Sequence, residues 1–311
     1  MRVCLIVNPI ASSMSDRRRE DIEARLASRH TVDAVRTERR GHARELAATA
    51  AADGVDVVVV AAGDGTLNEA ADALVGSTTA LAPLPGGSTN VFVRAVGYAK
   101  HLAPAIEQVL TALDRGDLRR VGVGRAGDRH FLFHLGVGFD AAVVERMERL
   151  SPTVKRYAAH PAFAAQTLRT LVRGYDRVAP LVHVATPDGQ NHDSFFTVVS
   201  NVAPYTFVGP RRMLLTPSAS LDRALAVTSL TRFRLSDVAG AFGSSVARAG
   251  HLQKAREVVQ LDDVQTLRLS AARPGLGFPW QVDGDYLGTV DALDVRYVPE
   301  ALTVVLPDQV V

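Results

Sequence analysis

The stretch from Asp56 to Glu69, with the sequence DVVVVAAGDGTLNE, carries the residues whose types and spacing best suit chemistry. Gly63 and Gly65 bracket Asp64, so the backbone can turn sharply there and approach a ligand closely. Thr66 is expected to cap the helix that follows. Amides at a helix N-terminus attract phosphate, and a carboxylate beside them points to a cation or a proton transfer. These residues predict a nucleotide site with magnesium, and the alternative is a tight turn with a helix cap.

Apolar strands and helices alternate around this turn. Val57 to Val60 are β-branched and uninterrupted, which predicts a strand buried on both faces. Further strands are expected at 3–7, 31–36 and 79–83. Helices are expected at 16–28, from the end of the 37–43 segment to about residue 52, at 67–74, after residue 90 and at 104–113. This alternation predicts a doubly wound parallel α/β sheet.

Polar and glycine turns follow each of these strands. Because parallel strands present their carboxyl ends at one edge, where such sheets bind ligands, we expect the turns to converge on one nucleotide. The expected phosphate donors, which need no lysine, are the amides of Gly63, Gly65, Gly86 and Gly87 and the hydroxyls of Thr37, Thr66 and Ser88. The expected cofactor-binding residues are Asn8, Thr37, Gly63, Asp64, Gly65, Thr66, Leu67, Asn68, Glu69, Gly86, Gly87, Ser88 and Asn90.

The pattern changes near residue 118. Beyond it, short apolar segments alternate with turns, which predicts a mainly β half with one helix at about 141–173 and a β-hairpin that pairs 181–185 with 194–200. We therefore expect an α/β domain at 1–118 and a mainly β domain at 119–311. The terminal strand at 302–306 could return to the first domain.

Composition excludes several classes of protein. The 311 residues are 47% hydrophobic and 22% charged, without a bias toward disorder, so packed domains are expected. No apolar run reaches the roughly 18 residues that a membrane-spanning helix needs, and the first residues lack a signal-peptide layout. A cytoplasmic protein is therefore expected. The single Cys4 lies in an apolar strand and is expected in the core.

The charge pattern bears on the partners. A formal net charge of +2 argues against nucleic acid as a partner. Arginines at 17–19 and 211–212 could still contact anionic phosphates locally, with solvated surface as the simpler interpretation. Lys100, Lys155 and Lys254 all lie outside glycine loops, which excludes a Walker-type P-loop.

Taken in order, GDGTLNE, PGGSTN, GVGFD and VDGD resemble the motifs of the diacylglycerol kinase catalytic-domain family, which includes bacterial lipid kinases and sphingosine and ceramide kinases. NPIAS at 8–12 and TERRGHA at 37–43 are similar to the family's nucleotide loops. The resemblance covers nearly the whole chain. It implies an α/β domain that binds ATP, a β-sandwich domain that takes the lipid, and phosphoryl transfer in the cleft between them. A lipid substrate also implies that the protein meets its substrate at a membrane surface, and one location for this is the periphery of the inner membrane face.

The resemblance also implies catalytic residues. Phosphoryl transfer needs charge neutralisation and a carboxylate that orients the acceptor hydroxyl or takes its proton. The family carries its proposed proton acceptor at the third position of a DGE motif, which implies this role for Asp285, with Asp283 beside it. Asp64 is expected to hold magnesium directly or through water, or to approach the acceptor hydroxyl. The alternative interpretation of Asp283 to Asp285 is a hairpin turn.

Three positions depart from the family's pattern. Val91 stands where the family has an acidic residue, and Asp285 is one methylene shorter than the family's glutamate. Arg223 stands where bacterial members have an acidic ligand of a structural magnesium. We therefore expect that ion to be absent and Arg223 to pair with carboxylates or carbonyls instead.

The expected function is an ATP- and Mg²⁺-dependent kinase that phosphorylates a hydroxyl of diacylglycerol or a similar lipid. The alternatives are a kinase of a soluble small molecule, and a lipid- or nucleotide-binding protein whose chemistry has lapsed, as Val91 and Arg223 could indicate. Apolar patterning leaves open which lipid is bound. It also leaves open whether an edge strand of the β domain pairs two copies into a homodimer.

Overall fold

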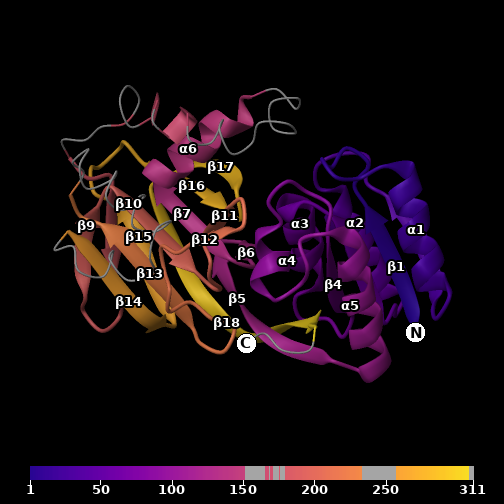
Figure 1. The fold of residues 1–311 in the computed structure, drawn as a ribbon. Helices are drawn as coiled ribbons and strands as arrows, with labels where there is room; N and C mark the ends of the chain where they lie inside the picture. The colour runs from indigo at the N-terminus through magenta and orange to yellow at the C-terminus, as the bar shows by residue number, and fades with distance from the viewer. Residues whose placement is uncertain (151–164, 168, 171–174, 176–178, 233–256, 308–311) are drawn as a thin grey trace. The chain divides into compact units, whose positions relative to one another are not determined.

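The computed structural model describes residues 1–150, 165–167, 169–170, 175, 179–232 and 257–307 (Figure 1). The chain divides into two compact units. Unit 1 comprises Met1–Val123 with Pro299–Val311, and unit 2 comprises Gly124–Val298. Strand β5 (Leu118–Ala126) and strand β18 (Ala292–Val305) each continue from one unit into the other.

Unit 1 is built on parallel strands in the order β2-β1-β3-β4. The end of β18 joins this sheet, since Val304 pairs in parallel with Leu81 of β4. The strands are β1 (Arg2–Val7), β2 (Thr31–Arg36), β3 (Val57–Ala62) and β4 (Ala80–Pro85). The helices are α1 (Asp16–Ala27), α2 (His42–Ala52), α3 (Asp64–Leu74), α4 (Val91–Ala95) and α5 (Leu102–Arg115).

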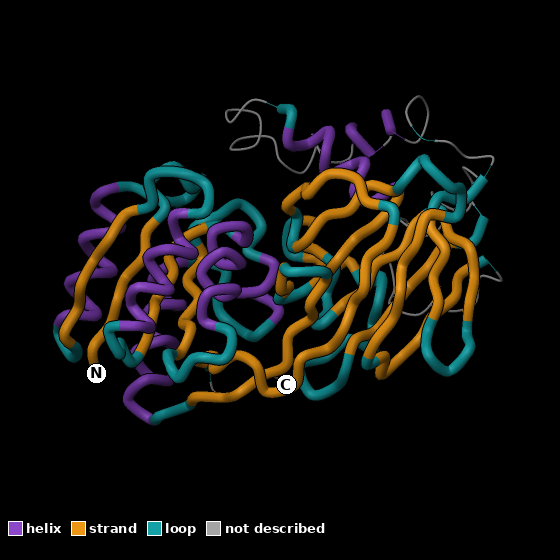
Figure 2. The backbone as a smooth tube through the Cα atoms, turned by 180° about the vertical axis from the view of Figure 1, so that it is seen from behind, coloured by secondary structure: helices purple, strands orange, loops and turns teal. Residues whose placement is uncertain are grey.

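The strand order puts helices on both faces of this sheet (Figure 2). The chain moves outward from β1 to β2 and then back past β1 to β3 and β4, so right-handed crossovers place α1 on one face and α2 and α3 on the other. Consistent with this, α1 contacts α5, and α2 contacts α3. Every residue of β3 is buried, and full burial of a valine contributes about 1.5–3 kcal/mol. Cys4 is also buried, as predicted, which raises the pKa of its thiol to about 11.

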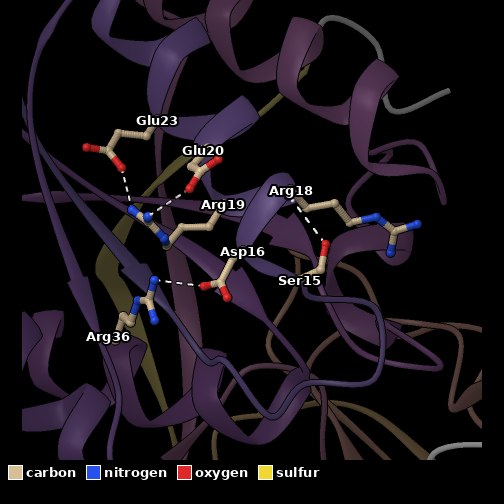
Figure 3. Close-up of polar contacts among 7 residues, drawn as sticks. All are labelled: Ser15, Asp16, Arg18, Arg19, Glu20, Glu23 and Arg36. Carbon is tan, nitrogen blue, oxygen red and sulfur yellow. Dashed lines mark hydrogen bonds and ion pairs between the residues drawn. The ribbon is translucent and has the colours of Figure 1, made fainter.

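Local polar contacts fix the start of α1 (Figure 3). Ser15 is its N-cap, and the Ser15 hydroxyl accepts a hydrogen bond from the amide of Arg18. Asp16, in the first turn, pairs with Arg36 at the end of β2 over 2.8 Å. The predicted helix at 16–28 is confirmed, with Ser28 as its C-cap.

Unit 2 contains an antiparallel sheet in the order β14-β13-β10-β7-β16-β17. A second layer pairs β9 with β8, β8 with β15, and β15 with β18, while β5 pairs with β6. The core between the layers includes Leu135, Val184, Trp280 and Val295. The strands not yet given bounds are β6 (Arg129–Phe131), β7 (His134–Gly138), β8 (Val182–Ala185), β9 (Asn191–Ser194), β10 (Phe196–Ser200), β13 (Leu225–Leu230), β14 (Val258–Val264), β15 (Thr266–Ala271), β16 (Phe278–Val282) and β17 (Asp285–Val290). Strands β11 (Thr206–Val208) and β12 (Arg211–Met213) form a separate hairpin.

The fold class predicted from the sequence is confirmed: a parallel α/β sheet is followed by an antiparallel β-sandwich. One predicted pairing is wrong. The sequence predicts a hairpin between 181–185 and 194–200, but β8 pairs with β9 (Asn191–Ser194), and β10 joins the other sheet. Ser194 ends β9 and Phe196 begins β10, so the chain changes layer at residue 195. The apolar run from Phe195 to Val199 gave no sign of that change.

The first part of the predicted helix at 141–173 corresponds to α6 (Phe139–Glu148). Of the rest, residues 151–164, 168 and 171–173 lie outside the described residues. Among the helices of the described residues, none has the length and apolar character that a membrane span requires.

Candidate functional site

The carboxyl edge of the unit 1 sheet collects the predicted turns. Asn8 follows β1, Thr37 follows β2, Gly63 follows β3 and Gly86 follows β4. The strand order reverses between β1 and β3, which is the place where open α/β sheets bind ligands. Asn8 and the Gly63 turn flank that point. The topology therefore puts the predicted nucleotide residues at the sheet's natural binding position.

Hydrogen bonds tie these turns to one another through α3. The side-chain amide of Asn8 donates to the Thr66 hydroxyl over 2.9 Å, and the amide of Gly41 donates to the Glu69 carboxylate over 2.8 Å. The amide of Ser13, in the first loop, donates to the carbonyl of Gly86 over 2.9 Å. Loops that are far apart in the sequence thus form one connected structure around the start of α3.

Two glycine turns touch backbone to backbone. A Cβ atom added to Gly87 would lie 2.7 Å from the Cα of Gly63, and one added to Gly86 would lie 2.7 Å from the Cα of Ala62. Real Cβ atoms do not approach backbone this closely, so the turns after β3 and β4 can pack together only because these residues are glycines.

We predict that Gly86→Ala destabilises unit 1 by about 1–3 kcal/mol, because the new methyl group must displace the backbone of β3. Gly65→Ala is the matched control. Gly65 lies one residue into α3 with nothing within 4 Å of an added Cβ, so alanine there should be neutral or slightly stabilising. Denaturant unfolding followed by the helical circular dichroism signal measures both changes. Equal stability of the two variants would contradict the close packing described above.

The start of α3 differs from the sequence prediction. The N-cap is Gly63 and the helix begins at Asp64, so Thr66 is not the cap, and its hydroxyl accepts from Asn8 instead. The amide of Leu67 donates to the carbonyl of Gly63, while helix geometry gives the amides of Gly65 and Thr66 no partner within the helix. The amides of Gly65 and Thr66 are therefore suited to an anion.

The glycines after β4 use their amides within the fold. The amide of Gly86 donates to the carbonyl of Ala62 over 2.9 Å, and that of Gly87 donates to the Asn90 side chain over 2.8 Å. In this structure the amides of Gly86 and Gly87, which the sequence predicts as phosphate donors, therefore have partners within the fold. Asn90 has a left-handed φ of 50° and closes the turn by donating back to the carbonyl of Gly87, while Ser88 is exposed at its tip.

The Asp64 carboxylate acts as a cap for α4. It accepts hydrogen bonds from the amides of Val91 and Phe92 over 3.0 and 3.2 Å. Burial raises the pKa of Asp64, while these amides and the charge of Arg94 oppose that rise. Two of its acceptor positions are thus used, and direct coordination of magnesium is left to the remaining lone pairs. The buried Val91 contributes its amide to this contact.

Arg94 and Ile10 also belong to this edge, although the sequence motifs did not single them out. Arg94 is half-buried, interacts electrostatically with Asp64, and its pKa is lowered by desolvation. The sequence signal for Arg94 is its position one helical turn after Asn90, the last residue of the PGGSTN motif. Ile10 is 86% exposed beside Asn8, where an apolar side chain can cover a ligand.

The remaining predicted residues of this edge take other places. Leu67 and Asn68 are each 2% exposed, so they support α3 from inside rather than presenting their side chains at the surface. Thr37 is buried, and its amide donates to the carbonyl of Val7. His42 begins α2, where its Nδ1 accepts from the amide of Glu38.

In unit 2, Asp283 and Gly284 form the turn of the β16–β17 hairpin. Their φ values of 49° and 84° are both positive, as a type I′ turn requires. The Asp283 carboxylate is buried and accepts from the amides of Leu132, Phe133 and His134 over 2.7 to 3.0 Å. Asp283 therefore holds the segment from Leu132 to His134 in place through its carboxylate oxygens.

Asp285 begins β17 and has a different environment. Its side chain is 21% exposed, and the Arg129 guanidinium lies 3.9 Å away. The amide of the next residue, Tyr286, donates to Glu148 at the end of α6 over 3.0 Å. Asp285 is thus a partly exposed carboxylate that lies near Arg129, and the strand that carries it is bonded to Glu148 through the next residue.

Asp140 is not the N-cap of its helix, since that position belongs to Gly138. The Asp140 carboxylate is buried and accepts from the Tyr205 hydroxyl over 2.5 Å and from the Gln281 side chain over 2.7 Å. Burial raises the pKa of Asp140. Gly136 makes room for it, since a Cβ there would lie 1.7 Å from an Asp140 oxygen. The two glycines in GVGFD were the sequence signal for this packing.

Arg223 pairs with a carboxylate. Its Nε and Nη2 contact both oxygens of Asp263, over 3.1 and 2.5 Å. Across the described ranges, no group of three or more His, Cys, Asp or Glu residues could hold a metal ion.

Comparisons with known proteins show that this chain is similar to proteins named as diacylglycerol kinases or lipid kinases. Residues 2–126 match the family model named "Diacylglycerol kinase catalytic domain". A diacylglycerol kinase of Mycobacterium tuberculosis is 26% identical over 275 residues, which are 85% of this chain and 81% of the relative. A protein of Pseudomonas putida named "Probable lipid kinase YegS-like" is 31% identical over 198 residues, which are 56% of this chain and 65% of the relative.

Solved structures share the fold. The crystal structure of a diacylglycerol kinase from Bacillus anthracis superposes with a TM-score of 0.72 at 18% identity and covers 100% of this chain and 98% of its own. Yeast NADH kinase in complex with NADH gives a TM-score of 0.52 at 8% identity, with 98% of this chain and 83% of its own covered. The predicted resemblance to the diacylglycerol kinase catalytic-domain family is confirmed.

Proposed function

On the premise that residues 2–126 carry a diacylglycerol kinase catalytic domain, we propose that this protein transfers the γ-phosphoryl group of ATP to a hydroxyl of a lipid such as diacylglycerol. The observation that supports the proposal most is the joining of the turns after β1, β2, β3 and β4 at the point where the strand order reverses. A single turn has many uses, but a connected set at this point is the arrangement expected of a nucleotide site.

The proposed nucleotide contacts come from the start of α3 and the exposed tip of the following loop. The amides of Gly65 and Thr66 stand at the positive end of an 11-residue helix, and Ser88 is exposed. Arg94 supplies a fixed positive charge near the same edge, in a site without a lysine. Transfer through a loose transition state needs this kind of positioning and charge neutralisation.

The residues fit a magnesium ion that is held chiefly by phosphate oxygens and water. Magnesium usually keeps several waters and uses one or two carboxylates, and Asp64 offers one carboxylate whose oxygens already accept two amides. When bound, the ion would neutralise charge on the β- and γ-phosphates. Asp64 would hold it through water while also fixing the start of α4.

Asp285 is the proposed acceptor of the lipid hydroxyl proton. A general base must be ionised and reachable, and Asp285 is a partly exposed carboxylate with a guanidinium 3.9 Å away. Asp283 is proposed as a positioning residue instead, because its buried oxygens accept three backbone amides.

The test is transfer from labelled ATP to a panel that contains diacylglycerol, ceramide, sphingosine and NAD, with and without magnesium. We expect a phosphorylated lipid that forms only when magnesium is present. Phosphorylation of NAD alone would favour a kinase of a soluble substrate. Binding of ATP with no transfer to any acceptor would contradict the proposal and favour a protein whose chemistry has lapsed.

A further inference from the structure

The β11–β12 hairpin of unit 2 presents an apolar and basic tip. The hairpin is a sheet of its own (Figure 1). Within it, Val208 lies opposite Arg211, and Phe207 lies opposite Arg212. Gly209 and Pro210 connect the strands. Val208 is 44% exposed, one of a few large apolar side chains on the described surface with so much exposure, and both arginines are exposed.

The base of this hairpin packs into the core of unit 2. Tyr205 and Met213 pack in a core cluster with Val198 and Leu215, and the amide of Tyr205 donates to the carbonyl of Met213 over 3.0 Å. The Tyr205 hydroxyl also donates to the buried Asp140. The two strands that carry the tip are therefore held at their base by packing and by a backbone hydrogen bond.

Arg211 and Arg212 differ from other arginines of this unit in their charge partners. Arg223 and Arg268 of the same unit each pair with an aspartate, at 2.5 and 2.7 Å. Among the residues that the structure describes, no acidic side chain pairs with Arg211 or Arg212, and the segment from 201 to 213 contains no acidic residue. An exposed valine on one side of the turn and two exposed arginines on the other side are a combination that suits an anionic bilayer surface. The apolar side chain can enter the interface while the guanidinium groups meet lipid phosphates.

We infer that the tip formed by Val208, Gly209, Pro210, Arg211 and Arg212 docks this protein on anionic lipid headgroups. The inference rests on the proposed function in one respect, since a lipid substrate explains why the protein would approach a bilayer. The docking itself is separable from catalysis, because it needs neither ATP nor transfer.

The experiment measures co-sedimentation of the full chain with vesicles, without ATP. Phosphatidylcholine vesicles and vesicles that also contain phosphatidylglycerol are compared for the wild type and for Arg211→Gln/Arg212→Gln. Each arginine near an anionic surface accounts for about a fivefold change in affinity, so the double variant should bind the anionic vesicles about 30-fold more weakly. Val208→Ser should also bind the anionic vesicles more weakly than the wild type, but the salt dependence of its binding should stay the same.

The matched control is Arg268→Gln/Arg296→Gln, which removes the same charge from exposed positions on β15 and β18. It should bind anionic vesicles nearly as well as the wild type. Equal losses in both double variants would overturn the inference, because net charge alone would then explain binding. Retention of vesicle binding by the hairpin variant, or binding of the hairpin to nucleic acid in place of vesicles, would also overturn it.

A kinase assay separates this failure from failure of the proposed function. A short-chain diacylglycerol in free solution should be phosphorylated equally by the wild type and by the hairpin variant, whereas a long-chain diacylglycerol in anionic vesicles should react more slowly with the variant. Absence of transfer to either acceptor contradicts the proposed function. Equal rates on vesicles contradict only the docking inference.

Discussion

Replacement of Asp285 by asparagine is expected to lower kcat for lipid phosphorylation by about 10²–10⁴-fold, the range by which general acid–base catalysis accelerates reactions. Asparagine keeps the size of the side chain and a hydrogen-bond acceptor but cannot take a proton. Asp285 is the partly exposed carboxylate of its turn, so the loss should appear in kcat while ATP affinity stays unchanged. The measurement is initial rates with labelled ATP over a range of lipid concentrations.

Asp294→Asn is the control for this result. Asp294 is also a strand aspartate paired with an arginine, Arg268, but it is 77% exposed and has no proposed role in catalysis. Its variant should retain wild-type rates. If Asp285→Asn turned over lipid at the wild-type rate, the base would have to be another group, and Asp64 would be the first to test.

The second large effect concerns stability. Asp283→Ala removes a buried carboxylate that accepts three backbone amides, of Leu132, Phe133 and His134. Unsatisfied buried donors cost about 1–3 kcal/mol each, so the free energy of unfolding of unit 2 should fall by at least about 3 kcal/mol. Alanine is also disfavoured at the positive φ of 49° that this turn requires.

Trp280 provides the readout. It is the single tryptophan of the chain and lies 8% exposed in the core of unit 2, so its emission during denaturant unfolding reports on that unit. Asp283→Asn should lose less stability, because one side-chain oxygen can still accept and asparagine tolerates positive φ. An alanine variant as stable as the wild type would show that the three amides find other partners.

The two aspartates of one turn thus differ in what they can do. Asp283 lies at the first central position of the turn and points into the protein, whereas Asp285 lies on the strand and stays partly exposed. The sequence spacing alone places them two residues apart and assigns the carboxylates no separate roles. Their environments separate a positioning residue from a candidate base.

The sequence determined the framework of unit 1 almost completely. The four consecutive valines at 57–60 leave no polar face for solvent, which predicts a strand buried on both faces. The alternation of strands with helices predicts parallel pairing and right-handed crossovers. The carboxyl-edge location of Asn8, Thr37, Gly63 and Gly86 follows from that pairing, because it depends only on local periodicity and chain direction.

The tertiary structure decided how individual groups are used. Nothing in the GDGT motif shows that Asp64 caps α4. Likewise, the local sequence does not show that the amides of Gly86 and Gly87 donate to Ala62 and Asn90. Nor does it show that Asp140 accepts hydrogen bonds from Tyr205 and Gln281. Each of these bonds joins segments whose approach is set by packing of the whole unit. A hydrogen bond depends on tenths of an ångström and on direction, whereas strand and helix patterns depend only on which residues are apolar and how they are spaced.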